Sequence, residues 1–424
     1  MDQPPTVSYP ITDLDQALEA VLGFAGRRRP DRIPLEMMSQ AMALLGNPHQ
    51  RLRVIHITGT CGKTSTAYYV RDLLQAGGFH TGMTISPHIT TLSERVQVGG
   101  EPLDEQTFCN RLEQMLVRLT PLAGQLTYFE LMICLALSTF ADQLVDYAIV
   151  EVGIGGVSDA TNIIANPDKV AVIGSIGLDH TEILGPTVVD IAAQKAGIMV
   201  HGGVAVVAKQ LDEVMDVLTS HADAIGARLI VVETSAPGSD GLTSFQAQNW
   251  AMARATLDYL ARRDHFALPD PTVIQLPQLE PPARYEWFFI GHHRVLLDGA
   301  HNQQEVTSLV QALIDQGIKP LPVLATLSNA PDGKVTQTIA ALKPLVSDLI
   351  VPQFILGHDD KVKQSVPAPQ IAAITAELGI NTHVVPDLDA ALAALLSYPS
   401  RDLLVTGSLY LAALVRPHLV ELAR

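Results

Sequence analysis

The chain has 424 residues, of which 47% are hydrophobic and 17% are charged, a composition typical of globular proteins. A chain of this length exceeds one ordinary core, so we expect two domains, or three. The 28 basic side chains are outnumbered by 44 acidic ones, and the formal net charge is −16. Nucleic-acid binding relies on clustered Lys and Arg, so this charge argues against a nucleic-acid partner.

Signals for export or for a membrane are not found in the sequence. Residues 1–5 have neither the basic start nor the apolar run of a signal peptide. The longest apolar run, residues 131–141, is about half the length that a bilayer requires, and we predict a buried helix there. Three cysteines, Cys61, Cys109 and Cys134, have no metal-ligand spacing and fit a reducing compartment. We therefore expect a cytoplasmic protein, and its acidic surface favours a monomer.

Short β-branched runs alternate with helical stretches along the first part of the chain. This rhythm predicts βαβ units and a mostly parallel sheet, covered on both faces, in a domain spanning residues 1–270. The predicted strands are residues 54–57, 147–152, 170–173, 204–207 and 229–232.

The proline-rich stretch that follows interrupts this rhythm, and we predict a linker over residues 271–283. Beyond it, residues 284–424 are expected to form a smaller, Rossmann-like α/β domain. A helix is predicted near residues 304–316, and the strands are residues 295–297, 323–326, 349–351, 384–385 and 403–405.

A glycine-rich segment follows the first predicted strand and leads directly into a helical stretch. It reads Thr58-Gly59-Thr60-Cys61-Gly62-Lys63-Thr64-Ser65. A strand that turns through glycines into a helix directs backbone N–H groups and the helix dipole at an anion, while a lysine reaches the outer phosphates. The segment therefore predicts a nucleotide site made by Gly59, Thr60, Gly62, Lys63, Thr64 and Ser65.

Three further residues suit ATP-dependent chemistry, which needs positive charge beside the phosphates. Glu151 ends a buried strand, where a carboxylate faces the ligand crevice of a parallel sheet and can bind Mg²⁺. His180 follows the next strand; a histidine alone is more often structural than a ligand, but its place after a strand of a nucleotide-binding domain favours a ligand. Lys195 lies in a small, apolar context that disfavours an ammonium, so it is either paired or chemically modified.

These motifs resemble, in order and through nearly the whole chain, those of the folylpolyglutamate/dihydrofolate synthases within the Mur ligase superfamily. The loop itself is of the short type found in that superfamily. The other matching segments are Leu45-Gly46-Asn47-Pro48, Ser86-Pro87-His88, Ser93-Glu94-Arg95-Val96, Thr127-Tyr128-Phe129-Glu130, Glu151-Val152-Gly153, Asp159-Ala160-Thr161-Asn162, Leu178-Asp179-His180, Lys195-Ala196-Gly197-Ile198, Gln246 with Asn249, Ala283-Arg284, Asp298-Gly299-Ala300-His301-Asn302 and Gly407-Ser408-Leu409-Tyr410.

The resemblance implies a role for each matching position. Lys63 would contact the outer phosphates of ATP, and His301 would lie beside the reacting phosphate and the incoming amino acid. Lys195 would be carbamylated and support a second metal ion. The remaining implied roles are Mg²⁺ binding by Ser86, Glu151 and His180, with one or two Mg²⁺ ions and an optional K⁺; nucleotide binding by Gln246, Asn249, Arg284 and Asp298; and substrate binding by Thr127, Phe129, Asp159 and Ala160.

The implied activity belongs to folate biosynthesis and one-carbon metabolism: ATP-dependent addition of L-glutamate to a folate or dihydropteroate carboxylate through an acyl phosphate. Two alternatives stay open, a Mur-type ligase acting on another carboxylate and a non-catalytic nucleotide-binding switch. Several positions depart from the family pattern, and the loss of an arginine near the expected substrate pocket weakens the folate assignment most. The departures are Val157-Ser158 for Arg-Leu, Phe245 for His, Gln303 for Pro, Thr64 for Gly and Cys61 for Asn.

Overall fold

The protein divides into two compact units, residues 1–279 and 280–424, which we describe separately. This computed structural model describes residues 10–26, 35–233, 239, 241–269, 281–328, 332–358, 361–385 and 387–424. Most of the predicted linker, residues 271–280, lies outside the described residues, so the linker and the exact domain limits stay predictions.

The first unit is built on an eight-stranded sheet with the order β4-β3-β2-β5-β1-β6-β7-β8. The strands from β2 to β8 in this order are parallel, whereas β3 and β4 are antiparallel additions at one edge. The central strands are wholly buried, as expected for a parallel sheet covered on both faces. The strands are β1 (Val54–Thr58), β2 (Thr81–Thr84), β3 (Gln97–Val98), β4 (Glu101–Pro102), β5 (Tyr147–Glu151), β6 (Val170–Ile173), β7 (Val204–Ala208) and β8 (Arg228–Val232).

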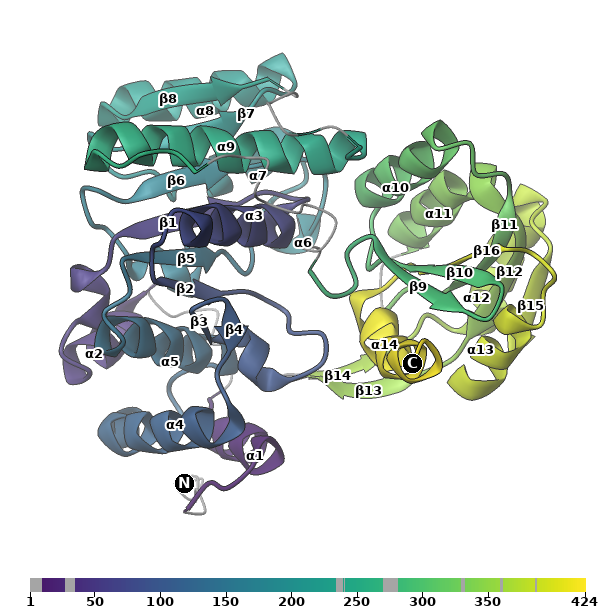
Figure 1. Ribbon diagram of the computed structural model, residues 1–424, viewed down its shortest axis with the longest axis horizontal. Coiled ribbons are helices and arrows are strands. Elements are labelled where there is room, and N and C mark those ends of the chain that lie inside the picture. Colours follow the sequence, from purple (N-terminus) through teal and green to yellow (C-terminus); the bar gives the residue numbers. More distant parts are fainter. Residues whose placement is uncertain are drawn as a thin grey trace. The chain divides into compact units, whose positions relative to one another are not determined.

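Helices cover this sheet and enclose its hydrophobic clusters. Figure 1 shows α3 and α9 running side by side, and their apolar side chains form one buried cluster with β1 and β5. A second cluster joins α7 and α8 to β6 and β7. The helices are α1 (Leu14–Phe24), α2 (Glu36–Leu44), α3 (Lys63–Ala76), α4 (Glu105–Leu119), α5 (Tyr128–Asp142), α6 (Thr181–Leu184), α7 (Val188–Ala196), α8 (Asp212–Ile225) and α9 (Ser244–Asp264).

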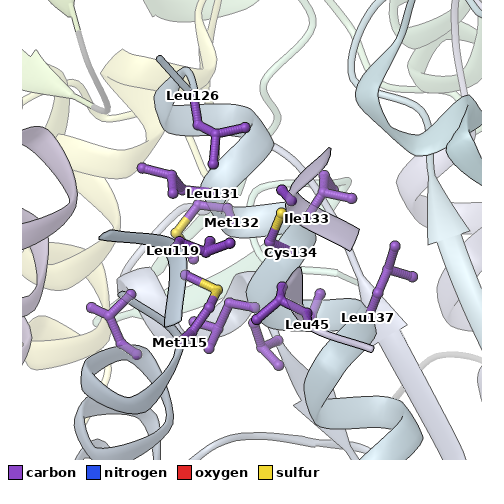
Figure 2. Close-up of a cluster of buried hydrophobic side chains, with 14 of the residues drawn as sticks. Leu45, Met115, Leu119, Leu126, Leu131, Met132, Ile133, Cys134 and Leu137 are labelled. Carbon is purple, nitrogen blue, oxygen red and sulfur yellow. The ribbon is translucent and has the colours of Figure 1, made fainter. Parts of the chain in front are cut away.

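The long apolar run 131–141 lies inside α5 and is buried, as predicted. Figure 2 shows Leu131, Met132 and Cys134 of this helix packed among side chains such as Leu119 and Met115 of α4. Burial of apolar surface at about 25 cal/mol per Å² makes such a cluster the main favourable term in folding. Within the residues that the structure describes, no helix is long and apolar enough to span a membrane.

The second unit contains a six-stranded sheet with the order β15-β12-β11-β16-β10-β9. Its strands are parallel except for β9, which pairs with β10 in the antiparallel sense. A separate hairpin joins β13 to β14. The elements are β9 (Glu286–Ile290), β10 (His293–Leu297), α10 (Gln303–Asp315), β11 (Leu321–Ala325), α11 (Asp332–Leu342), β12 (Val346–Pro352), β13 (Ile355–His358), β14 (Lys361–Gln364), α12 (Ala368–Leu378), β15 (Thr382–Val385), α13 (Leu388–Leu396), β16 (Asp402–Thr406) and α14 (Leu409–Leu422).

The predicted fold class, two α/β parts with mostly parallel sheets, is confirmed. Every predicted strand run overlaps an observed strand, and the helix predicted near residues 304–316 is α10. The sequence analysis missed β2, β3, β4, β9, β13 and β14. Two of these, β3 and β4, are only two residues long, too short for an alternating pattern to be recognised.

Candidate functional site

The glycine loop leaves β1 after Thr58 and ends where α3 begins at Lys63. Gly62 has φ +77°, and a Cβ atom there would lie 2.1 Å from Oδ1 of Asn249. Only glycine fits this position, because the conformation is left-handed and the neighbouring side chain is too close. The first N–H groups of α3 therefore face the loop with no side chain at the N-cap to occupy them, which is the arrangement that binds phosphates.

Two lysines converge on this loop. The ammonium group of Lys63 donates to the carbonyl oxygens of Gly59, at 3.1 Å, and Thr60, at 3.3 Å. Lys195, from the last turn of α7, donates to the same Gly59 oxygen at 2.8 Å. Burial, reinforced by the nearby charge of Lys63, lowers the pKa of Lys195 to about 7. The two amines thus lie at the same carbonyl oxygen of the glycine loop, and the charge of one disfavours the charge of the other.

A pocket opens beside this loop. Its walls include Lys63 and Lys195, together with Asp179 and His180, which follow β6. The glycine-rich segment 152–155 after β5 completes the lining. The predicted residues Lys63, His180 and Lys195 therefore meet at one pocket, because parallel strands end at the same edge of a sheet.

Glu151 lies at the end of β5 and contacts the first turn of α3. The hydroxyl of Thr64 donates to Oε1 and Oε2 of Glu151 at 3.1 and 3.2 Å. The backbone N–H of Ser86 donates to Oε2 at 3.3 Å. Glu151 is only 2% exposed, so its carboxylate is held rigidly beside the phosphate loop.

The donor atoms around Glu151 fit a magnesium ion. The buried carboxylate of Glu151 and the adjacent Thr64 hydroxyl supply oxygen ligands of the kind that Mg²⁺ prefers. Ser86 contacts Glu151 through its backbone N–H, so binding of Mg²⁺ by its side chain stays a prediction. A second cation is a different case, because Lys195 as an amine is a donor and cannot bind a metal until it becomes a carbamate. In the described part of the chain, no three His, Cys, Asp or Glu side chains gather as a ready metal cluster.

Two of the predicted nucleotide residues lie at the start of α9. The side-chain oxygen of Gln246 accepts hydrogen bonds from the backbone N–H and the hydroxyl of Thr243, at 2.9 and 2.7 Å, and so caps the helix. Asn249 lies against Gly62, as the glycine geometry requires. Asn249 therefore lies beside the glycine loop, and its contact with a nucleotide stays a prediction, while Gln246 has a helix-capping role that was not predicted.

The four residues predicted to bind substrate differ in their contacts. Phe129 and Asp159 both adjoin Gly153, whose missing Cβ would lie 2.7 Å from the Phe129 ring. Asp159 accepts from the N–H of Ile154 at 3.0 Å and from Thr161, and burial raises the pKa of its carboxyl group. Thr127 caps α5 in a capping box with Glu130, and Ala160 is buried. Asp159 and Thr127 thus have structural contacts that account for them, and their substrate role stays a prediction.

A buried polar chain connects this substrate segment to β1, and the sequence analysis missed it. Nε2 of His56 lies 2.8 Å from the Thr161 hydroxyl, and its Nδ1 lies 3.5 Å from the Lys169 amine. Lys169 donates to the Ile164 carbonyl at 2.6 Å. Burial lowers the pKa of Lys169 to about 7 and that of His56 well below its usual value. The only sequence signal was a lysine directly before a buried strand.

The predicted residues of the second unit gather where β10 ends and α10 begins. Asp298 is buried and accepts from the N–H groups of Tyr285 and Ala300, each at 2.8 Å, and burial raises its pKa to about 6. Arg284 adjoins Gly299, whose Cβ would lie 2.9 Å from the guanidinium. His301 follows, so Arg284, Asp298 and His301 form one cluster. Glu305, which contacts His301, was not predicted as a site residue. Its position four residues after His301, at the start of a predicted helix, could have indicated the pair.

Comparisons with known proteins agree with this geometry. Residues 57–253 match the model of the Mur ligase middle domain. The chain is 31% identical over 361 residues to the dihydrofolate synthase/folylpolyglutamate synthase of Mycobacterium tuberculosis, covering 75% of this chain and 73% of the relative. It is 29% identical over 418 residues to the enzyme of the same name from Bacillus subtilis, covering 91% and 94%.

Solved structures of folylpolyglutamate synthases also match this chain over nearly its whole length. The Mycobacterium tuberculosis folylpolyglutamate synthase complexed with ADP superposes with a TM-score of 0.80 at 27% identity, covering 96% of this chain and 99% of that one. A folylpolyglutamate synthase complex with AMPPCP and folate gives a TM-score of 0.78 at 26% identity, covering 96% and 100%. The chain therefore belongs to the folylpolyglutamate/dihydrofolate synthase family of Mur ligases.

Proposed function

We propose that this protein is an ATP-dependent, ADP-forming ligase that joins L-glutamate to the carboxylate of a folate or of dihydropteroate. The observation that carries the proposal is the contact of Glu151 with Thr64 on the first turn of α3, beside the loop that bears Lys63. Relatives named for this activity, and relatives crystallised with ADP, AMPPCP and folate, support ATP and a folate as ligands. An ATP-consuming enzyme of this kind is expected in the cytoplasm.

The first half-reaction is phosphoryl transfer. An oxygen of the substrate carboxylate attacks the γ-phosphorus of ATP, the bond to the β-phosphate oxygen breaks, and an acyl phosphate and ADP result. The N–H groups of α3 hold the phosphates, and Lys63 exchanges its loop carbonyls for the γ-phosphate oxygens. Glu151, with the hydroxyls of Thr64 and Ser86, would hold Mg²⁺, which would neutralise phosphate charge when bound.

The second half-reaction is amide formation. The amine nitrogen of glutamate attacks the acyl carbon, a C–N bond forms, the C–O bond to phosphate breaks, and the amine loses a proton. The negative charge on the departing phosphate needs a nearby donor, and the family resemblance assigns this region to His301. Arg284 and Asp298, clustered with His301, belong to the same part of the proposed site.

We also propose that Lys195 is carbamylated. An amine whose pKa is about 7 is unprotonated in about half of the molecules near neutral pH, and only the unprotonated amine can attack CO₂. The nitrogen bonds to the carbon of CO₂, the nitrogen loses a proton to water, and the amine becomes a carbamate, whose oxygens can bind a metal ion. A carbamate signal in the ¹³C NMR spectrum of protein equilibrated with ¹³C-bicarbonate, absent from K195M, is the expected result; equal spectra for both proteins would exclude the modification.

One observation favours the alternative of another carboxylate substrate. Val157 stands where the family pattern has an arginine, and its side chain is 43% exposed and packs against Gly197. An acidic substrate tail therefore loses a bidentate partner there. A ligase acting on a less acidic carboxylate would tolerate this change better than one acting on a polyglutamate tail.

The test measures ADP release with Mg²⁺, ATP and glutamate, and compares dihydropteroate, tetrahydrofolate and no acceptor, with mass spectrometry of the products. We expect a glutamate adduct of at least one acceptor and a loss of about 100-fold in K63A, because removal of a phosphate-binding charge typically costs two to three orders of magnitude. K209A is the matched control, since Lys209 is an exposed lysine paired with Glu233. If ATP binds but neither acceptor stimulates turnover, the folate assignment fails, and other carboxylates or a non-catalytic switch take its place.

A further inference from the structure

Lys169 is a buried basic residue of the first unit that the proposed reaction does not use. Its side chain is 2% exposed, and its amine donates to the carbonyl oxygen of Ile164 at 2.6 Å. Two further acceptors, Oδ1 of Asn162 and Nδ1 of His56, each lie 3.5 Å from the same nitrogen. Burial lowers the pKa of this amine to about 7, so keeping it inside the fold as a cation costs stability.

The carboxyl group of Asp159 lies at the other end of the polar chain that starts at Lys169. It accepts from the backbone N–H groups of Ile154 and Thr161, each at 3.0 Å, and from the Thr161 hydroxyl at 2.5 Å. Burial raises the pKa of this carboxyl group, and these three donors oppose the rise. Donors on every side stabilise the ionised form, which can only accept.

The hydrogen bonds between these two ends run in one direction. The Thr161 hydroxyl has one hydrogen, which goes to Asp159, so Nε2 of His56, 2.8 Å away, donates to the hydroxyl oxygen. Burial and the charge of Lys169 lower the pKa of His56 well below its usual value. The ring is therefore neutral, and its Nδ1 accepts from Lys169. The chain thus runs from the lysine through the ring and the hydroxyl to the carboxylate.

This chain ends at a wall of the pocket beside the phosphate loop. Ile154, whose N–H is held by Asp159, belongs to the segment 153–155 that lines the pocket. A branch of the same network starts at Asn162, whose amide donates to the carbonyl oxygen of Gly197 at 3.1 Å, in the turn after α7. The network therefore ties the pocket wall both to β1 and to the end of α7.

We propose that Lys169 is a positioning residue for the acceptor substrate, which acts by holding the pocket wall, residues 153–159, through His56 and Thr161. This inference rests on the proposed function, which brings the acceptor carboxylate to this pocket. At 2% exposure Lys169 cannot touch a bound ligand itself. Stability alone does not explain a lysine here, because an apolar side chain of similar length avoids the cost of burying a charge.

Hydrogen–deuterium exchange of the full-length protein, measured by mass spectrometry, tests the positioning without catalysis. In K169M the peptide covering residues 152–165 should exchange about tenfold faster than in the wild type, the size expected from the loss of one hydrogen bond to a charged group. Peptides from α4 and α8, outside this network, should exchange as before. T161V breaks the chain at the hydroxyl and should also speed exchange, whereas T161S keeps the hydroxyl and should not. K209M, at an exposed lysine, is the matched control.

Steady-state kinetics supplies a readout that a purely structural role would not move. With dihydropteroate or tetrahydrofolate as acceptor, K169M and T161V should raise the acceptor KM about tenfold, with kcat and the affinity for AMPPCP within about twofold of the wild type. T161S should keep the wild-type KM. Unchanged exchange of the 152–165 peptide, faster exchange throughout the first unit, or an unchanged acceptor KM would each overturn the inference. If exchange changes as expected but the wild type turns over neither acceptor, the network holds the pocket wall and the proposed function fails.

Discussion

Lys169 makes the stability of the first unit depend on pH. Its side chain is 2% exposed, and the pKa of its amine is about 7 in the folded chain, against 10.5 for an ordinary lysine. The difference, 10.5 − 7, is about 3.5 units, equal to about 5 kcal/mol at 1.36 kcal/mol per unit, and serves as an upper bound. K169M removes the titrating group and keeps an unbranched apolar chain.

The direction of this pH dependence is set by how many protons Lys169 binds in the folded and the unfolded chain. Between about pH 7 and pH 10.5 the unfolded chain holds a proton on Lys169 and the folded chain does not, so wild-type stability gains from rising pH, by about 1.4 kcal/mol per unit from this group. Below pH 7 the folded amine must also be protonated, and the whole cost of its burial is present. The stability of the wild type relative to K169M should therefore rise by about 2 kcal/mol from pH 7 to pH 9.

Urea unfolding followed by tryptophan fluorescence measures this difference. The chain has two tryptophans, and W287F leaves Trp250, which is buried in the first unit against Tyr69, as the single reporter. Lys195 is present in both proteins, so its own titration cancels in the comparison. K209M, at an exposed lysine, should give no pH-dependent difference. Curves for the wild type and K169M that run parallel from pH 6.5 to pH 9 would refute the reasoning.

Two further predictions concern the phosphate loop. G62A should weaken binding of an ATP analogue by at least about tenfold, because a Cβ atom would lie 2.1 Å from the Asn249 side chain in a left-handed conformation. The control is G226A, at φ +64° with open space around it, which should lower stability only. Equal nucleotide affinity in both variants would contradict the geometry. T64A should raise the Mg²⁺ concentration needed for half-maximal activity several-fold, because it removes the hydroxyl that holds Glu151; an unchanged Mg²⁺ dependence would show that Thr64 has no part in cation binding.

The phosphate loop and its neighbours could be predicted because local sequence determines them. The strand β1, the glycines and the first turn of α3 are consecutive, and each has a conformational reason to be there. The placement of Glu151 was predictable for a similar reason, since it ends a buried strand of a parallel sheet. Thr64 was predicted as part of the nucleotide site and noted as a departure from the family pattern, but its contact with Glu151 needed the structure.

Contacts between distant residues were not predictable in this way. His56 and Lys169 are separated by 113 residues, and no sequence pattern links a histidine in one strand to a lysine before another. The capping roles of Thr127 and Gln246 are different, because the spacing of a capping box is written in the sequence at Thr127 and Glu130. Thr127 was predicted to bind substrate and Gln246 to bind the nucleotide, and the capping role of each was not predicted.

The positions of the reactive side chains follow one rule in both units. In the first unit Glu151 ends one parallel strand and Lys63 follows the loop after another; in the second unit Asp298 and His301 lie between the end of β10 and the start of α10. A parallel sheet gathers its carboxyl ends at one edge, so residues far apart in sequence meet there without any long-range signal. What the sheet does not determine is the protonation state of each group. That depends on single contacts such as Glu305 with His301.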